Sequence, residues 1–370
     1  MSEITRREAI KIFGATVATL LVNPTVYANQ IIQSGSPITF ESTDKPGIIF
    51  VVGDGMPMST LTALQRLRES VGRTTTFYKR FQDSDSVITY MGTASLSSVV
   101  TDSAPASAAW ATGVHTANHF LSSLPNGKKL KTIGEIAKEN GYDIGLVTTT
   151  RVTHATPAAW YSHNPDRDDE ANIAVDALQI EPTVLMGGGL KYFDKNVNPK
   201  LSNNLIDDFK NKGYNVLTKA QEISSIDYSK PILGLFNKSH ISYYLDRLND
   251  DKLSYQPSLA TLAAVALKKL QDSKKGFVLQ IEAGRIDHAN HANDAYGALI
   301  VLAYGNQAKQ LIPSRRIENV ELFKSMLSYL NIPYYQNPTM TQKEAKAIIK
   351  DLYKNYPNEK WANSLRLHVS

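Results

Sequence analysis

Short apolar runs alternate along this chain with stretches of helical periodicity, and this alternation limits the fold more than any other feature. The run Gly47–Val52 ends at Gly53 and predicts a buried strand. Lys131–Asn140 has the periodicity of a helix and stops before Gly141, and Ile144–Thr149 predicts the next strand. Strands that alternate with helices indicate a mainly parallel sheet with helices on both faces. We therefore predict an α/β fold: a three-layer α/β/α sandwich around a mainly parallel central sheet.

The same pattern continues toward the C-terminus. Pro182–Met186 and Gly276–Ile281 predict two more strands, and Ser258–Leu270 predicts an alanine-rich helix. In open α/β sheets, binding sites form at the carboxyl ends of the strands. Asp54 and Glu282 each follow an apolar strand, so we expect both carboxylates at that edge of the sheet.

The N-terminus has the pattern of an export signal. Arg6 and Arg7 precede a short apolar run, Ile12–Val22, and Val26-Tyr27-Ala28 has small or apolar residues at the cleavage positions. This pattern is typical of a signal peptide, and the paired arginines indicate twin-arginine export to the periplasm or the medium. An ordinary amphipathic first helix is the alternative. The predicted organisation is a signal peptide, a linker, one large domain and a peripheral helical tail, over residues 1–28, 29–45, 46–332 and 333–370.

Composition excludes several classes of site. The chain has no cysteine, so disulfides, cysteine metal sites and thiol nucleophiles are excluded. A formal net charge of +5 on 370 residues suits a small anionic substrate, but without a clustered basic face it is not typical of nucleic-acid binding. For the same reason we predict no nucleic-acid partner. Beyond the N-terminus no long apolar run occurs, so we also predict no membrane-spanning segment.

Ser103 lies in a run of small residues where a loop is predicted to turn into a helix. The free N–H groups and the dipole of such a helix favour an anion in front of them. The alternative is that Asp102 or Ser103 only caps a core helix.

Further along the chain, His154 follows a predicted strand and Arg167 lies in a polar loop. The flat guanidinium of an arginine can bind two phosphate oxygens at once. The alternative is a surface arginine that pairs with Asp166 or Asp168.

The segment Glu282–His291 is the strongest local signal for a metal. Asp287 and His291 are four residues apart, so on a helix they share a face and are able to hold one ion.

Taken together, these motifs resemble the alkaline phosphatase family from about Pro46 to Leu299, and they occur in the family's order. They are Gly53–Met56, Thr101–Ala104, Ala111–Gly113, His154–Thr156, Arg167, Gly187–Gly189 and Glu282–His291.

The resemblance implies hydrolysis of small phosphate monoesters. Ser103 would attack phosphorus and form a phosphoserine that water hydrolyses, with Arg167 clamping the phosphate. A homodimer is one arrangement that the resemblance implies, and the residues leave it open.

The resemblance also implies Mg²⁺ and Zn²⁺ as cofactors. Asp54 would bridge a magnesium and a zinc that also faces Ser103, and Asp287 with His291 would hold the other zinc. The rest of the magnesium shell would come from His154, Thr156 and Glu282.

The chain departs from the family after His291. Relatives carry a Thr-Ala-Asp-His and a His-Thr-Gly segment there, which supply three metal ligands, and neither segment is present. Ile300–Gly305 resembles the family's last strand and Ile317–Leu330 its last helix. We therefore predict a shortened member that lacks one interior strand and has incomplete zinc sites. None of His115, His119, His240 and His368 is expected to restore them.

Two functions stay open at this point. One is a metal-dependent phosphomonoesterase. The other is a non-catalytic relic of the same fold that keeps a magnesium or phosphate site. A sulfatase or phosphomutase on a related fold is a weaker third reading, and the lack of cysteine argues against a sulfatase with a cysteine-derived formylglycine.

Overall fold

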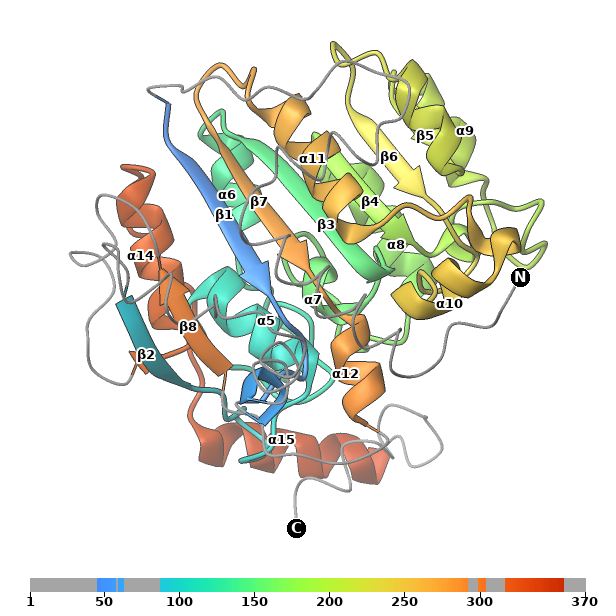
Figure 1. Ribbon diagram of the computed structural model, residues 1–370. Coiled ribbons are helices and arrows are strands. Elements are labelled where there is room, and N and C mark those ends of the chain that lie inside the picture. The colour runs from blue at the N-terminus through green and yellow to red at the C-terminus, as the bar shows by residue number, and fades with distance from the viewer. Residues whose placement is uncertain (1–44, 58, 63–86, 292–298, 304–316, 356–370) are drawn as a thin grey trace.

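The computed structural model describes residues 45–57, 59–62, 87–291, 299–303 and 317–355. A six-stranded sheet forms the centre, with the strands in the order β1-β7-β3-β4-β6-β5 (Figure 1). All neighbouring strands in it are parallel. The strands are β1 (Gly47–Val52), β7 (Phe277–Glu282), β3 (Asp143–Arg151), β4 (Val184–Gly188), β6 (Ile232–Leu235) and β5 (Asn215–Leu217). The predicted strands are thus confirmed: β1 has the predicted bounds, and those of β3, β4 and β7 shift by one or two residues.

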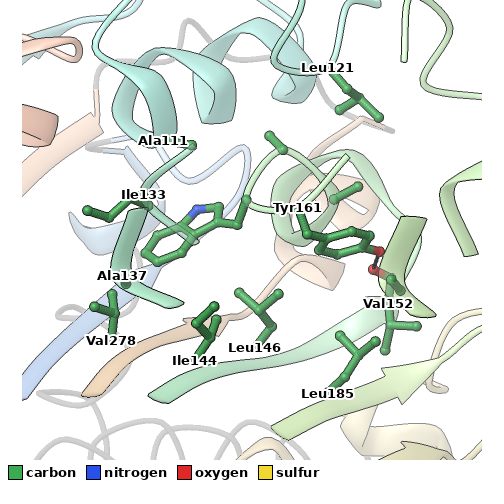
Figure 2. Packing of buried hydrophobic residues seen from close by; sticks show 14 of the residues in the cluster. Ala111, Leu121, Ile133, Ala137, Ile144, Leu146, Val152, Tyr161, Leu185 and Val278 are labelled. Carbon is green, nitrogen blue, oxygen red and sulfur yellow. Dashed lines mark hydrogen bonds between the residues drawn. The ribbon is translucent and has the colours of Figure 1, made fainter. Parts of the chain in front are cut away.

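Helices cover both faces of this sheet, as predicted for a three-layer sandwich. One face packs against helices whose buried residues join a single large core. Figure 2 shows part of it, with Ala111, Ile133 and Ala137 lying over Ile144, Leu146 and Val278 of the strands. The helices of this layer are α5 (Ser103–Thr112), α6 (Ile133–Glu139), α7 (Ala155–Ala158), α8 (Glu170–Ile180), α9 (Leu205–Asn211) and α14 (Glu321–Tyr329).

The opposite face packs on α11 (Leu259–Leu270), the alanine-rich helix expected from the sequence. Ser258 caps its N-terminus through a hydrogen bond from the Thr261 N–H. The predicted helix Lys131–Asn140 is shorter in the structure, because Thr132 and Glu135 form a capping box that starts α6 at Ile133.

The prediction that Gly47–Val52 is a buried strand is wrong in one respect, because β1 is buried on one face only. Val52 is buried, and Ile48 and Phe50 pack on the large core, but Ile49 and Val51 are 49% and 60% exposed. The physical reason is position: β1 is at the edge of the sheet, and α11 covers β3, β7 and β4. The missing interior strand stays a prediction.

A small second sheet has the order β8-β2-β9, with β2 (Val87–Gly92), β8 (Leu299–Ala303) and β9 (Ile317–Glu318). The strand expected near residues 300–305 is therefore present as β8. It pairs antiparallel with β2 in this small sheet, and not with the central sheet. The helix expected after residue 317 is present as α14.

In the tail, α15 (Gln342–Asn355) confirms a helix. Ala345 and Ile349 are buried against the loops that follow α5, including Phe120 and Leu124. The remaining short elements are α10 (Tyr244–Asn249), α12 (Arg285–Asn290) and the 3₁₀ turns Leu190–Tyr192, Ala220–Ser225 and Asp251–Leu253.

The predicted signal peptide and all but the last residue of the predicted linker lie outside the described residues. Within them, no helix has the length and apolar character needed to cross a bilayer.

Candidate active site

Three neighbouring parallel strands end at the same place, and this register builds the site. Val52 of β1 lies opposite Glu282 of β7, and Glu282 lies opposite Thr148 of β3. Asp54 follows β1 by two residues. The expectation that Asp54 and Glu282 meet at the carboxyl edge of the sheet is therefore confirmed.

Ser103 is the first residue of α5 and points at this edge. Its hydroxyl Oγ lies 3.0 Å and 2.9 Å from the two carboxylate oxygens of Asp54, and donates to that carboxylate. The capping role belongs to Asp102, whose carboxylate accepts from the Ala104 N–H at 2.6 Å. Ser103 is therefore free to face Asp54 while its neighbour holds the helix end.

Asp54, His154 and Glu282 form a compact group of potential metal ligands. One ring nitrogen of His154 and one carboxylate oxygen from each acid lie within 4.8 Å of one another. His154 immediately precedes α7, and Thr156 lies on α7 beside Glu282. The Glu282 carboxylate also accepts hydrogen bonds from the hydroxyls of Thr148 and Thr150.

Two buried atoms of this group have no hydrogen-bond partner in the described part of the chain: His154 Nδ1 and Glu282 Oε1. Burial, together with repulsion from Glu282 and Asp287, raises the pKa of Asp54 to about 8. Burial likewise raises the pKa of Glu282. Burial and the nearby Arg167 charge lower the pKa of His154, so the ring is neutral. Crowded carboxylates, one of them with an unpaired buried oxygen, are a donor set that fits a divalent cation.

Arg167 is held between two polar partners at the rim of this group. One guanidinium nitrogen lies 3.2 Å from Asp102 Oδ1, and another lies 2.9 Å from His154 Nε2. The Arg167 side chain is only 16% exposed. The alternative of a surface arginine paired with Asp166 or Asp168 is therefore wrong, because its ion pair is with Asp102.

Asp287 and His291 lie on one face of α12 and its C-terminal cap, as the spacing predicts. His291 Nε2 is 3.2 Å from Asp287 Oδ2, and the imidazole is 74% exposed. Asp287 also lies directly against Gly55, where φ is +57° and a Cβ atom would come within 2.7 Å of the Asp287 Cα. Glycine at this position therefore allows Asp287 to lie beside Asp54.

Comparison with known proteins supports the family resemblance that the sequence motifs indicated, over most of the chain. A sequence model of alkaline phosphatase matches residues 45–312. The chain belongs to the alkaline phosphatase family.

Two curated alkaline phosphatases of Bacillus subtilis illustrate the extent of the similarity. Alkaline phosphatase 4 is 39% identical over 206 residues, which are 54% of this chain and 42% of that protein. Alkaline phosphatase 3 is 34% identical over 262 residues, which are 68% and 54% of the two chains. The chain spans about half the length of these relatives.

Solved alkaline phosphatases share the fold. The Thermus thermophilus enzyme superposes with a TM-score of 0.74 at 24% identity, covering 83% of this chain and 95% of that one. The enzyme of the Antarctic bacterium TAB5 gives 0.66 at 21% identity, covering 78% and 99%.

Beside the family motifs lies a polar cavity of about 270 Å³ that sequence reasoning missed. Arg151 at the end of β3 forms a two-pronged ion pair with Glu170, at 2.6 Å and 2.5 Å. Among the other lining residues are His240, His288 and Arg167. The ring centroids of His240 and His288 are 4.5 Å apart, and both rings lie within 6 Å of the His154 ring.

Little in the sequence marked these extra residues. His240 lies far from any acidic residue in a ligand-like spacing, and the structure makes it a hydrogen-bond acceptor for the Arg151 N–H at 3.3 Å. Burial and the Arg151 charge lower the pKa of His240 to about 2, so it is uncharged. Arg151 carried one usable signal, because it lies two residues after the predicted strand Ile144–Thr149, at the edge where sites form.

Proposed function

We propose that this chain hydrolyses phosphate monoesters, with Ser103 as the nucleophile. The observation that carries the proposal is the Ser103 hydroxyl, which starts α5 and lies within 3.0 Å of the Asp54 carboxylate. A serine aimed from a helix N-terminus at a cluster of potential metal ligands suits attack on a phosphate ester. Membership of the alkaline phosphatase family supports the same chemistry.

In the proposed reaction, Ser103 Oγ loses its proton to water as it forms a bond to phosphorus, and the ester P–O bond breaks. The leaving oxygen takes a proton from water and departs as the alcohol, and a water molecule then cleaves the Oγ–P bond, which releases phosphate and restores the Ser103 hydroxyl. Asp54 orients the hydroxyl through its hydrogen bond.

Arg167 is the proposed phosphate clamp. Asp102 and His154 hold its guanidinium near Ser103, on the wall of the polar cavity. Its remaining N–H groups are suited to two phosphate oxygens, because the guanidinium is planar.

The proposed cofactors are Mg²⁺ and Zn²⁺. Asp54, His154, Thr156 and Glu282 would hold the magnesium-type ion. Asp287 and His291 would hold a zinc, and Asp54 and Ser103 the other. A bound cation would lower the pKa of the attacking hydroxyl and offset the charge that develops on oxygen. In support, a variant of the TAB5 enzyme has been solved with Mg bound in its M3 site.

The second candidate function is a relic that binds a metal or phosphate without turnover. The observation that favours it is the missing Thr-Ala-Asp-His and His-Thr-Gly segments, which leaves each zinc with two protein ligands. Zinc sites have three or four protein ligands, so we propose that both zincs bind weakly. Export through residues 1–28 and pairing into a homodimer remain predictions.

The test is hydrolysis of p-nitrophenyl phosphate with added Mg²⁺ and Zn²⁺, together with acid trapping of a radiolabelled phosphoenzyme. We expect both signals in the parent chain and neither in Ser103→Ala. Ser98→Ala is the matched control, because the hydroxyl of that half-buried serine only accepts a hydrogen bond from the Val100 N–H. No turnover, but retained Mg²⁺ binding, would favour the relic; equal turnover in Ser103→Ala would refute the proposed nucleophile.

A further inference from the structure

A second cluster of potential metal ligands lies on the other side of the Arg167 loop. One ring nitrogen of His119 and one carboxylate oxygen each from Asp166 and Asp168 lie within 4.8 Å of one another. These three residues belong to none of the family motifs described above. His119 lies in the loop after α5, and the two aspartates lie in the loop before α8.

Backbone hydrogen bonds bring the two loops together and hold them in register. The Arg167 N–H donates to the His119 carbonyl at 3.0 Å. The Asp168 N–H donates to Asp166 Oδ1, and the Asp166 N–H donates to Asn164 Oδ1, both at 2.9 Å. The three side chains are therefore grouped by an ordered turn.

Within the described residues, no direct ion pair offsets the charges of this cluster, although Arg167 lies near enough to Asp168 for their charges to attract. Arg167 lies between the two aspartates in sequence but pairs with Asp102, and across the described ranges neither aspartate forms an ion pair with a lysine or arginine. His119 Nδ1 is buried and has no hydrogen-bond partner there either. Two facing carboxylates and an imidazole with an unused nitrogen suit a cation.

We propose that His119, Asp166 and Asp168 bind a divalent cation of the manganese or zinc class, separate from the Asp54 group. One imidazole and two carboxylates suit these ions. Asp168 is exposed, so water completes the coordination.

The cation has a clear structural consequence. The backbone N–H of His119 donates to Asp102 Oδ2 at 2.6 Å, and Asp102 Oδ1 accepts from the Arg167 guanidinium. A cation that joins the His119 loop to the Asp166–Asp168 turn therefore fixes both the backbone and the side chain of Arg167. This positioning role, unlike the binding itself, rests on the proposed function.

Binding is tested in the full-length chain carrying Asp54→Asn and Glu282→Gln, which disable the Asp54 group. Mn²⁺ is titrated into the metal-free protein, and bound ion is counted by electron paramagnetic resonance. We expect one equivalent that disappears, or binds at least about tenfold more weakly, with either Asp168→Asn or His119→Asn added. Asp168 is exposed, so its variant tests the site without disturbing the core.

The matched control is Asp169→Asn, which removes the same charge one residue away, where the carboxylate only accepts from Asn164 and Asn172. It should leave the Mn²⁺ count unchanged. Unaltered Mn²⁺ binding in Asp168→Asn and His119→Asn would overturn the proposal. An equal loss in Asp169→Asn would also overturn it, because it would indicate a general charge effect.

The positioning role is tested by calorimetric titration of inorganic phosphate with Mn²⁺ present, in the chain with the Asp54 group intact. We expect about threefold to tenfold weaker phosphate binding in Asp168→Asn than in Asp169→Asn. Equal phosphate affinities would refute the positioning role. A parent chain that binds Mn²⁺ at this cluster but no phosphate would contradict the proposed function and leave the cation site standing.

Discussion

Ser103 Oγ donates a hydrogen bond to the Asp54 carboxylate, although the two residues are 49 positions apart in sequence. Asp54 follows an edge strand and Ser103 starts a helix of the layer that packs on the large core. Because the alanines of α5 are buried without bulk, the helix end approaches the strand end closely. The same contact places the hydroxyl beside the Asp54 carboxylate, which Glu282 and Asp287 repel.

Replacement of Arg167 by lysine should weaken phosphate binding. Lysine keeps the charge but offers no planar pair of donors, and it cannot contact Asp102 and His154 as the guanidinium does. We expect inorganic phosphate to bind about tenfold more weakly, and KM to rise more than kcat falls. Arg247→Lys is the control, since Arg247 donates to the carbonyls of Gln256 and Pro257. Equal affinities in both variants would contradict a clamp at Arg167.

Removal of divalent cations should destabilise the protein most at alkaline pH. In the cation-free fold the pKa of Asp54 is raised from 3.8 to about 8, so the folded state holds a proton that the unfolded chain releases. Cation-free stability therefore falls as pH rises from about 4 through 8, and the cation, which displaces that proton, stabilises more over the same window.

The measurement is thermal unfolding with Mg²⁺ or with a chelator at pH 6 and pH 8.5. A cation at a hundredfold excess over Kd should add about 2.7 kcal/mol to the free energy of unfolding. The gap between the two conditions should widen at pH 8.5 and vanish in Asp54→Asn, but not in the exposed Asp207→Asn. A gap that is the same at both pH values would rule out the coupling.

Disruption of the Arg151–Glu170 ion pair should cost more stability than a surface pair. The two side chains are 17% and 4% exposed, and the Glu170 carboxylate also accepts from Thr153 and Tyr192. Arg151→Met leaves a buried carboxylate without its counter-ion and should lower the free energy of unfolding by about 3–5 kcal/mol.

Urea unfolding of Arg151→Met, Glu170→Gln and the double variant tests this pair. The double variant should lose less than the sum of the two single changes, because it no longer buries an unpaired charge. Lys230→Met, which removes an exposed pair with Asp227, should cost far less stability than Arg151→Met. Additive losses would show that the two charges are not coupled.

Because of His163, the free energy of unfolding should fall as pH rises from weakly acidic to alkaline values. Its ring nitrogens donate to Glu135 Oε1 and the Ser122 carbonyl, each at 2.9 Å. Burial alone lowers the pKa of His163, but the hydrogen bond and charge of Glu135 outweigh it and raise the pKa above 6.5. A histidine whose pKa is higher in the folded state than in the unfolded state stabilises the fold fully below the unfolded-state pKa. This contribution is lost as pH rises through the folded-state pKa.

We therefore expect the parent to lose about 1 kcal/mol relative to His163→Gln as pH rises from 6 to 8.5. The difference in urea midpoints between the two proteins measures this term, because other histidines contribute equally to both. His115 gives an opposite contrast: burial lowers its pKa, so His115→Gln should relieve a loss of stability at acid pH. A parent and His163→Gln pair with parallel pH profiles would contradict this prediction.

The sequence was sufficient for the parts of the fold that depend on local pattern. Apolar runs predicted β1, β3, β4 and β7, and periodicity with caps predicted α6 and α11, because backbone hydrogen bonding and burial repeat along each element. The rule that sites form at the carboxyl ends of parallel strands predicted that Asp54 and Glu282 lie together, since parallel strands in register end side by side.

The cavity and the exposed edge were decided by contacts between distant segments. His240 meets Arg151 across 89 residues, and no local pattern encodes such a pair. The apolar run predicted Ile49 and Val51 to be core residues. Their exposure depends on which strand lies at the edge of the sheet and on where α11 lies.

By itself the sequence determined the alternating elements, the family motifs and the edge of the sheet where they act, because each depends on residues near one another in the chain. Only the tertiary structure decided that Arg167 pairs with Asp102, that β8 joins the small sheet and that His119 meets Asp166 and Asp168. Those contacts follow from how whole elements pack, and the free energy of packing is shared among residues far apart in sequence.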